Sequence, residues 1–119
     1  MNFIKDIGTR RGDRDCLYPH SAEETMKHWL IKAMIFKILH DLGRNVRTEA
    51  QSEETNGNVV DVLDEDNLVA YEVETVLTRK IIEQKLRNLW RLHDVFVIDT
   101  RKIPDGIEAA DEYLKRKIV

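Results

Sequence analysis

The chain has 119 residues, of which 42% are hydrophobic and 34% are charged, and this length and composition predict one globular domain rather than a disordered chain. Its net charge of −3 indicates no particular partner, and its longest apolar region, residues 30–39, is too short and too charged to cross a membrane. The N-terminal residues contain no apolar stretch suited to a signal peptide, and the single cysteine, Cys16, excludes an internal disulfide, so we expect a cytoplasmic protein.

The first elements are an N-terminal arm and a helix. Residues 1–18 show little hydrophobic periodicity, and we expect them to be a loosely held arm. The helix is predicted to begin after Ser21, which can cap it with Glu24 as the capping-box partner, and to run to about Leu42, before Gly43. Apolar residues cover most of its circumference, which predicts packing on more than one side, within the domain or across a homodimer interface.

The remaining elements predict a mixed sheet. Candidate strands at 45–51, 59–63 and 68–74, separated by turns, indicate an antiparallel meander. A helix at 78–92 leads to the apolar run at 94–99, which is typical of a buried parallel strand, and a helix at 107–117 closes the chain. The predicted fold class is α/β, a single domain over residues 1–119 with the order α-β-β-β-α-β-α.

Three acids fall inside or beside the predicted strands. Glu72 and Glu74 alternate onto one face, and Asp61 on the neighbouring strand can share that face. No Lys or Arg lies between Arg47 and Arg79 to neutralise them. Converging carboxylates repel one another unless one is protonated or a cation binds, and Mg²⁺ or Mn²⁺ bound there could assist attack on a phosphodiester. A simple solvated face is the alternative.

The order of these elements, with Asp61 followed by Glu72-Val73-Glu74, resembles the restriction-endonuclease-like superfamily, also called PD-(D/E)xK nucleases, over residues 20–100. The resemblance implies a central mixed sheet flanked by helices and a Mg²⁺- or Mn²⁺-dependent endo- or exonuclease acting on DNA or RNA. It implies Asp61 and Glu72 as metal ligands and Glu74 as a ligand or water-orienting base. Glu23 or Glu24 would match a further acid of the family.

The family motif carries a lysine where this chain has Glu74. A second metal ion could do the work of that lysine, or a displaced lysine on the following helix could do it, and Lys80 and Lys85 are the candidates. A nuclease-like domain that binds nucleic acid or a protein partner without cutting is the alternative function, and a purely structural module is a third.

Nucleic-acid contacts would have to come from basic residues outside the acidic centre. The N-terminal arm and one side of the helix at 78–92 could supply them, although a solvated helix face is the alternative for that helix. The four histidines show no ligand spacing and are predicted at the surface or at helix ends, and the two tryptophans are predicted in the core or at an interface. The candidate nucleic-acid contacts are Arg10, Arg11, Arg14, Lys80, Gln84, Arg87 and Arg91.

Overall fold

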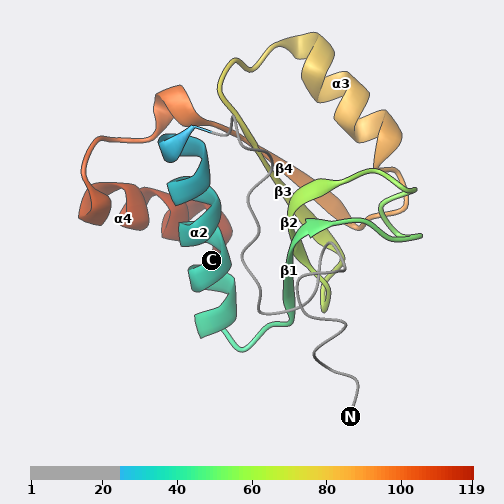
Figure 1. Cartoon of the computed structure of the whole chain (residues 1–119), viewed down its shortest axis with the longest axis horizontal. Helices are drawn as coiled ribbons and strands as arrows, with labels where there is room; N and C mark the ends of the chain where they lie inside the picture. The colour runs from blue at the N-terminus through green and yellow to red at the C-terminus, as the bar shows by residue number, and fades with distance from the viewer. Residues whose placement is uncertain (1–24) are drawn as a thin grey trace.

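Four strands form one mixed sheet in the computed structural model, which describes residues 25–119 (Figure 1). The strands are β1 (Val46–Ala50), β2 (Val60–Asp64), β3 (Val69–Glu74) and β4 (Asp94–Asp99), and they lie in the spatial order β1-β2-β3-β4. The first three are antiparallel neighbours, and β4 runs parallel to β3. The predicted α/β class, the meander and the parallel last strand are therefore confirmed.

The helix α2 (Met26–Asp41) begins later than the sequence indicated. Thr25 has an extended backbone, and its side chain accepts a hydrogen bond from the N–H of His28 at 3.1 Å, so Thr25 is the N-cap rather than Ser21. Ser21 and Glu24 lie outside the described residues. At the other end, Gly43 has a φ of +79°, the left-handed conformation expected after a helix. No helix in the described part of the chain is long and apolar enough to span a membrane.

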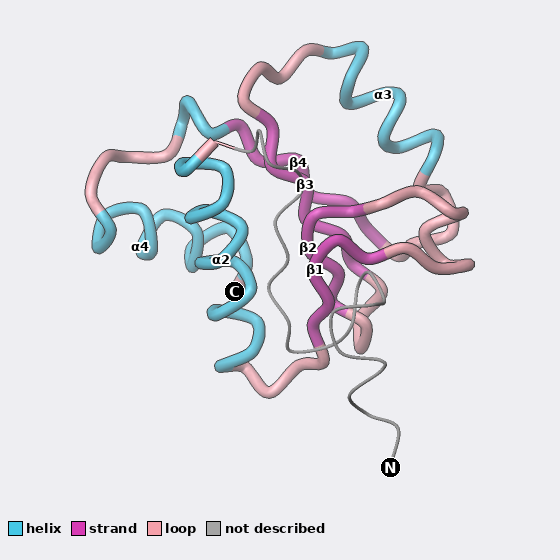
Figure 2. Tube along the Cα trace, in the orientation of Figure 1, coloured by secondary structure: helices cyan, strands magenta, loops and turns pink. Residues whose placement is uncertain are grey.

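One face of the sheet is covered by α2 and by α4 (Ile107–Ile118), which lie on the same side of it (Figures 1 and 2). A cluster of buried hydrophobic side chains lies between these helices and the sheet. It joins Ile35 and Leu39 of α2 and Leu114 of α4 to strand residues such as Val62 and Tyr71. Each fully buried aliphatic side chain of this kind contributes about 1.5–3 kcal/mol through removal of apolar surface from water. This cluster is the main core of the domain.

The other face is covered by α3 (Arg79–Asn88) more sparsely. Thr78 caps the helix by accepting a hydrogen bond from the N–H of Ile81, as its position in the sequence indicated. The helix ends at Asn88 rather than near residue 92, and none of its own residues is buried. Leu89 and Leu92, which follow it, make the second core cluster with residues of β1 to β3. Packing alone therefore holds α3 weakly.

The strand β4 has the predicted bounds but not the predicted burial. It is the last strand of the sheet in the described part of the chain, and Phe96 remains 39% exposed. The prediction of a buried strand holds only for Ile98 and Asp99, because an edge strand is covered on fewer sides than a central one. A 3₁₀ turn, η1 (Thr100–Lys102), then leads toward α4.

A buried ion pair ties α2 to the sheet. Lys32 is completely buried, and its Nζ lies 3.6 Å from Oε1 of Glu49 in β1. Glu49 is itself 2% exposed and has a φ of +49°, a left-handed conformation that is uncommon for any residue other than glycine. The strain and the desolvation of both charges indicate that this contact fixes where α2 crosses β1.

We expect Lys32→Met to lower the free energy of unfolding by about 3–5 kcal/mol, because it removes the buried ammonium group that lies 3.6 Å from the buried Glu49 carboxylate. The double variant Lys32→Met/Glu49→Gln should recover part of that loss. Urea unfolding followed by circular dichroism measures both. Lys37→Met, which removes an exposed ammonium from the same helix, is the control and should change stability by less than about 0.5 kcal/mol. A Lys32 effect no larger than this would contradict the assignment.

Candidate active site

Two carboxylates close the gap where β2 and β3 separate. The strand pairing is regular from Asp64↔Val69 to Val62↔Tyr71, and the next positions along the two strands are Asp61 and Glu72. There the N–H of Val73 donates to Oδ2 of Asp61 at 2.8 Å, and the N–H of Asp61 donates to Oε2 of Glu72 at 3.2 Å. We call this reciprocal arrangement the carboxylate bracket. In this arrangement both acids are buried, and each uses one carboxylate oxygen to accept a backbone N–H.

Lys85 brings a positive charge from α3 to these acids. Its Nζ lies 2.9 Å from Oε1 of Glu74 and 3.5 Å from Oε1 of Glu72, and its side chain is 23% exposed. Residues 48–78 contain no lysine or arginine, but the fold places the ammonium group of Lys85 beside their acids. Of the two lysines considered as replacements for the motif lysine, the structure brings Lys85 to the carboxylates and leaves Lys80 exposed on α3 without a contact to them.

His28 approaches the bracket from α2. Its Nε2 donates to the carbonyl oxygen of Val73 at 3.0 Å and lies 3.6 Å from Oδ2 of Asp61. Its side chain is 15% exposed and lies in the first turn of α2, so the predicted position at a helix end is confirmed, whereas its contacts with the sheet were not predicted. The signal that could have revealed it is spacing: His28 lies on the same side of the helix as Ile31, Lys32 and Ile35, which face the sheet.

The surroundings shift the pKa values of Asp61 and Glu72 in opposite directions. Burial by itself raises the pKa of Asp61, but His28 and the N–H of Val73 outweigh it and bring the pKa below its usual value. Burial and the neighbouring Asp61 charge raise the pKa of Glu72 to about 8, and Lys85 only partly opposes them. Burial lowers the pKa of Lys85, but the carboxylates prevail and raise it. Near neutral pH the site therefore holds an ionised Asp61, a largely protonated Glu72 and a charged Lys85.

These side chains border an open cleft of about 490 Å³. The bracket acids and Glu74 line it from the sheet, Lys85 from α3, and Thr75 and Val76 from the segment after β3. The cleft is large enough to admit a phosphodiester group with water around it. Its lining residues are His28, Val59, Asp61, Glu72, Val73, Glu74, Thr75, Val76 and Lys85.

The remaining candidates are not part of this cluster. Arg91 contacts Glu53 at 3.4 Å and lies over the ring of Trp90, whose 65% exposure rules out a place in the core. Lys80, Gln84 and Arg87 are exposed on α3. Five candidates lie outside the described residues: Arg10, Arg11, Arg14, Glu23 and Glu24.

The donor set bears on which metal could bind. Among residues 25–119, no three His, Cys, Asp or Glu side chains are grouped as a metal site. Asp61 and Glu72 nevertheless present two adjacent, buried carboxyl groups, and burial together with the Asp61 charge raises the pKa of Glu72. Mg²⁺ commonly takes one or two carboxylates and keeps several waters, so this pair fits a hydrated Mg²⁺ or Mn²⁺ ion rather than a closed cage of protein ligands.

Comparisons of the chain with protein-family models, with curated proteins and with solved structures find no match.

We expect the free energy of unfolding to fall as pH rises from about 5 to 8 in the presence of a chelator. Over this range folded Glu72 keeps a proton that the unfolded chain has lost, since its pKa is about 8 when folded and near 4.5 when exposed. The slope from this one group reaches at most about 1.4 kcal/mol per pH unit. Urea unfolding at several pH values measures it.

Glu72→Gln should flatten this slope, because glutamine stays neutral throughout. Glu108→Gln, which changes an exposed acid on α4, is the matched control and should keep the wild-type slope. Equal slopes for Glu72→Gln and the wild type would show that Glu72 is ionised in the folded protein across this range.

Proposed function

We propose that this chain is a metal-dependent nuclease with a restriction-endonuclease-like core, which hydrolyses phosphodiester bonds of DNA or, as the second choice, RNA. The observation that carries the proposal is the position of Lys85, which the helix between β3 and β4 brings within 3.5 Å of both Glu72 and Glu74. Two buried carboxylates with a lysine beside them, in an open cleft, suit charge stabilisation during phosphodiester hydrolysis. A solvated acidic face would need neither the burial nor the lysine.

Asp61 and Glu72 are the residues that would hold the metal ion. When bound, Mg²⁺ or Mn²⁺ supplies polarisation of the phosphate and a water of lowered pKa. The N–H of Val73 and the ring of His28 fix the orientation of Asp61, so one carboxylate oxygen is kept toward the protein and the other is left for the cleft. His28 is thus a positioning residue.

Lys85 takes the place of the motif lysine. Its ammonium group can counter the negative charge that develops on the phosphate and can orient the attacking water. Glu74 accepts the closer contact from Lys85, at 2.9 Å, and so holds the ammonium group at the mouth of the cleft. In this proposal the Glu74–Lys85 pair does what a single lysine on the strand would do, and no second metal ion is required.

Contacts to the rest of the nucleic acid remain predictions. The exposed side of α3, with Lys80, Gln84 and Arg87, is available to phosphates, and Arg91 could exchange Glu53 for a phosphate.

A homodimer also remains a prediction. The exposed apolar side chains of α2, Met26 at 71% and Leu30 at 42%, are the described residues of the first helix that could contribute to it.

We expect the full chain to cut single-stranded, duplex or branched DNA, or RNA, only when Mg²⁺ or Mn²⁺ is present. Asp61→Asn keeps an acceptor for the N–H of Val73 but removes the charge, and it should lower the rate by about 10²–10³-fold or more. Lys85→Met should lower it by about 10²-fold. Gel assays on labelled substrates, with metal and with chelator, measure these rates.

Arg79→Met is the matched control for Lys85→Met, because both are cations of α3, only Lys85 reaches the acids, and Arg79 is not one of the candidate nucleic-acid contacts. It should stay within about threefold of the wild type. Cutting that persists in chelator or in Asp61→Asn would refute the proposed metal site. Salt-sensitive binding with no cutting would establish the alternative, a nuclease-like domain that has lost catalysis.

A further inference from the structure

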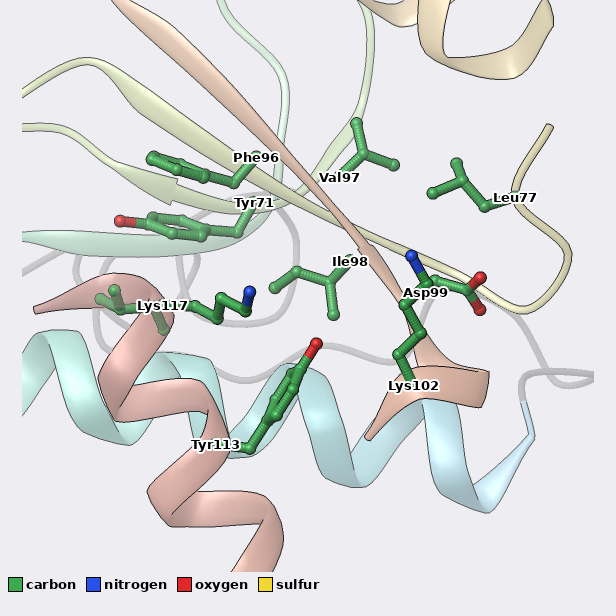
Figure 3. Close-up of a pocket in the computed structure, with 10 residues that line it drawn as sticks. Tyr71, Leu77, Phe96, Val97, Ile98, Asp99, Lys102, Tyr113 and Lys117 are labelled. Carbon is green, nitrogen blue, oxygen red and sulfur yellow. The ribbon is translucent and has the colours of Figure 1, made fainter. Parts of the chain in front are cut away.

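A second cavity lies between β4 and α4, on the opposite side of the sheet from α3. It has a volume of about 190 Å³, and Figure 3 shows its walls. The rings of Tyr71 and Phe96 stack at 5.4 Å between centroids at one end, and Ile98 lies in the middle. Polar groups enter it from η1 and α4. The lining residues are Tyr71, Leu77, Phe96, Val97, Ile98, Asp99, Lys102, Tyr113, Lys117 and Ile118.

The cavity carries excess positive charge. In Figure 3 the side chains of Lys117 and Lys102 extend on either side of Ile98, and the hydroxyl of Tyr113 points toward the same residue. Neither lysine has an ion pair with a carboxylate in the described part of the chain, and Lys117 instead lies 5.5 Å from the centre of the Tyr113 ring.

Asp99, the acid of this cavity, is already neutralised. Arg101 donates to its two carboxylate oxygens from Nε and Nη2, at 3.0 and 2.9 Å, and its backbone N–H donates at 2.9 Å. Lys102 also acts on the charge of Asp99, but the hydrogen bonds of Asp99 go to Arg101, so Arg101, Lys102 and Lys117 together outweigh this one carboxylate. Two ammonium groups with a hydroxyl donor, facing one small cavity, attract an anion rich in oxygen acceptors.

The cavity and the acidic cleft share a short segment of chain. Thr75 and Val76 line the cleft, and the next residue, Leu77, lines the cavity. Glu74 and Asp99 are also register partners at the ends of the parallel strands β3 and β4, so the two sites meet at the same end of this strand pair. A strand of nucleic acid that crosses this segment from the cleft would bring a nearby phosphate to the lysines.

We propose that Lys102, Lys117 and Tyr113 form a phosphate-binding subsite in this cavity. Its volume admits a phosphate group with water but is small for a whole nucleotide. The claim that the phosphate belongs to a nucleic-acid strand rests on the proposed function, whereas phosphate binding itself does not. With this subsite, the protein would hold the substrate by a phosphate of the strand that is cut, next to the carboxylates. It would not depend on recognising the shape of a duplex.

Two measurements in chelator test this subsite without any need for cleavage. Inorganic phosphate titrated into the ¹⁵N-labelled full chain should shift the amide signals of residues 98–102 and 113–117 saturably, and Lys102→Ala/Lys117→Ala should abolish the shifts. In fluorescence anisotropy, a labelled 12-nucleotide single strand should bind the double variant about tenfold more weakly. The slope of log K against log salt should fall by about 0.7, the value for one phosphate contact on a single strand.

Lys37→Ala/Lys115→Ala is the control, because it removes the same charge from exposed positions of α2 and α4 outside the cavity. Phosphate binding with unchanged oligonucleotide affinity would assign the subsite to free phosphate and overturn its assignment to nucleic acid. If neither ligand distinguishes the double variant from the control, the subsite is refuted and the lysines only shield the edge of β4. A protein that binds both ligands as expected but never cuts would refute the proposed catalysis and leave the subsite standing.

Discussion

Burial of carboxylates where β2 and β3 separate is the constraint on which the site depends. Asp61 and Glu72 are 7% and 4% exposed, so each must find polar partners to offset the loss of water. Part of that need is met inside the sheet by the N–H groups of Val73 and Asp61 itself. The rest is met by His28 from one face and Lys85 from the other. Both covering layers are therefore fixed to the sheet at the same point.

The strand boundaries followed from local chemistry, which is why the sequence predicted most of the fold. Turns such as Asn56-Gly57, both with positive φ, are encoded by the residues that form them. The capping-box rule favoured Ser21 as the helix cap because Glu24 follows it three residues later, whereas Thr25 caps α2 through its side chain alone. The exposure of Phe96 depended on which strand lies at the edge, and that is a property of the whole sheet rather than of residues 94–99.

The acids of the site were visible in the sequence, but their partners were not. Alternation along a strand places Glu72 and Glu74 on one face without any tertiary information. Lys85 could only be named as one of two candidates, because the turn before α3 decides which lysine points to the sheet. No sequence pattern pointed to His28 or Lys32. Each contacts an acid on a strand that is distant in sequence: His28 lies beside Asp61, and Lys32 lies beside Glu49.

Because Lys85 lies on α3 and not on β3, the lysine of the candidate site is in place only when α3 is packed against the sheet. A lysine at position 74 would be held by β3, which is paired with β2 and β4. Lys85 is carried by a helix with no buried residue of its own, and that helix is anchored by Leu89 and by the contacts of Lys85 with Glu72 and Glu74. Elements with so little packing open at low free-energy cost, so the complete cluster exists only while α3 is docked. In the proposed nuclease Glu74 would thus have a double effect: it stands where the family motif has a lysine, and its 2.9 Å contact holds Lys85 at the cleft.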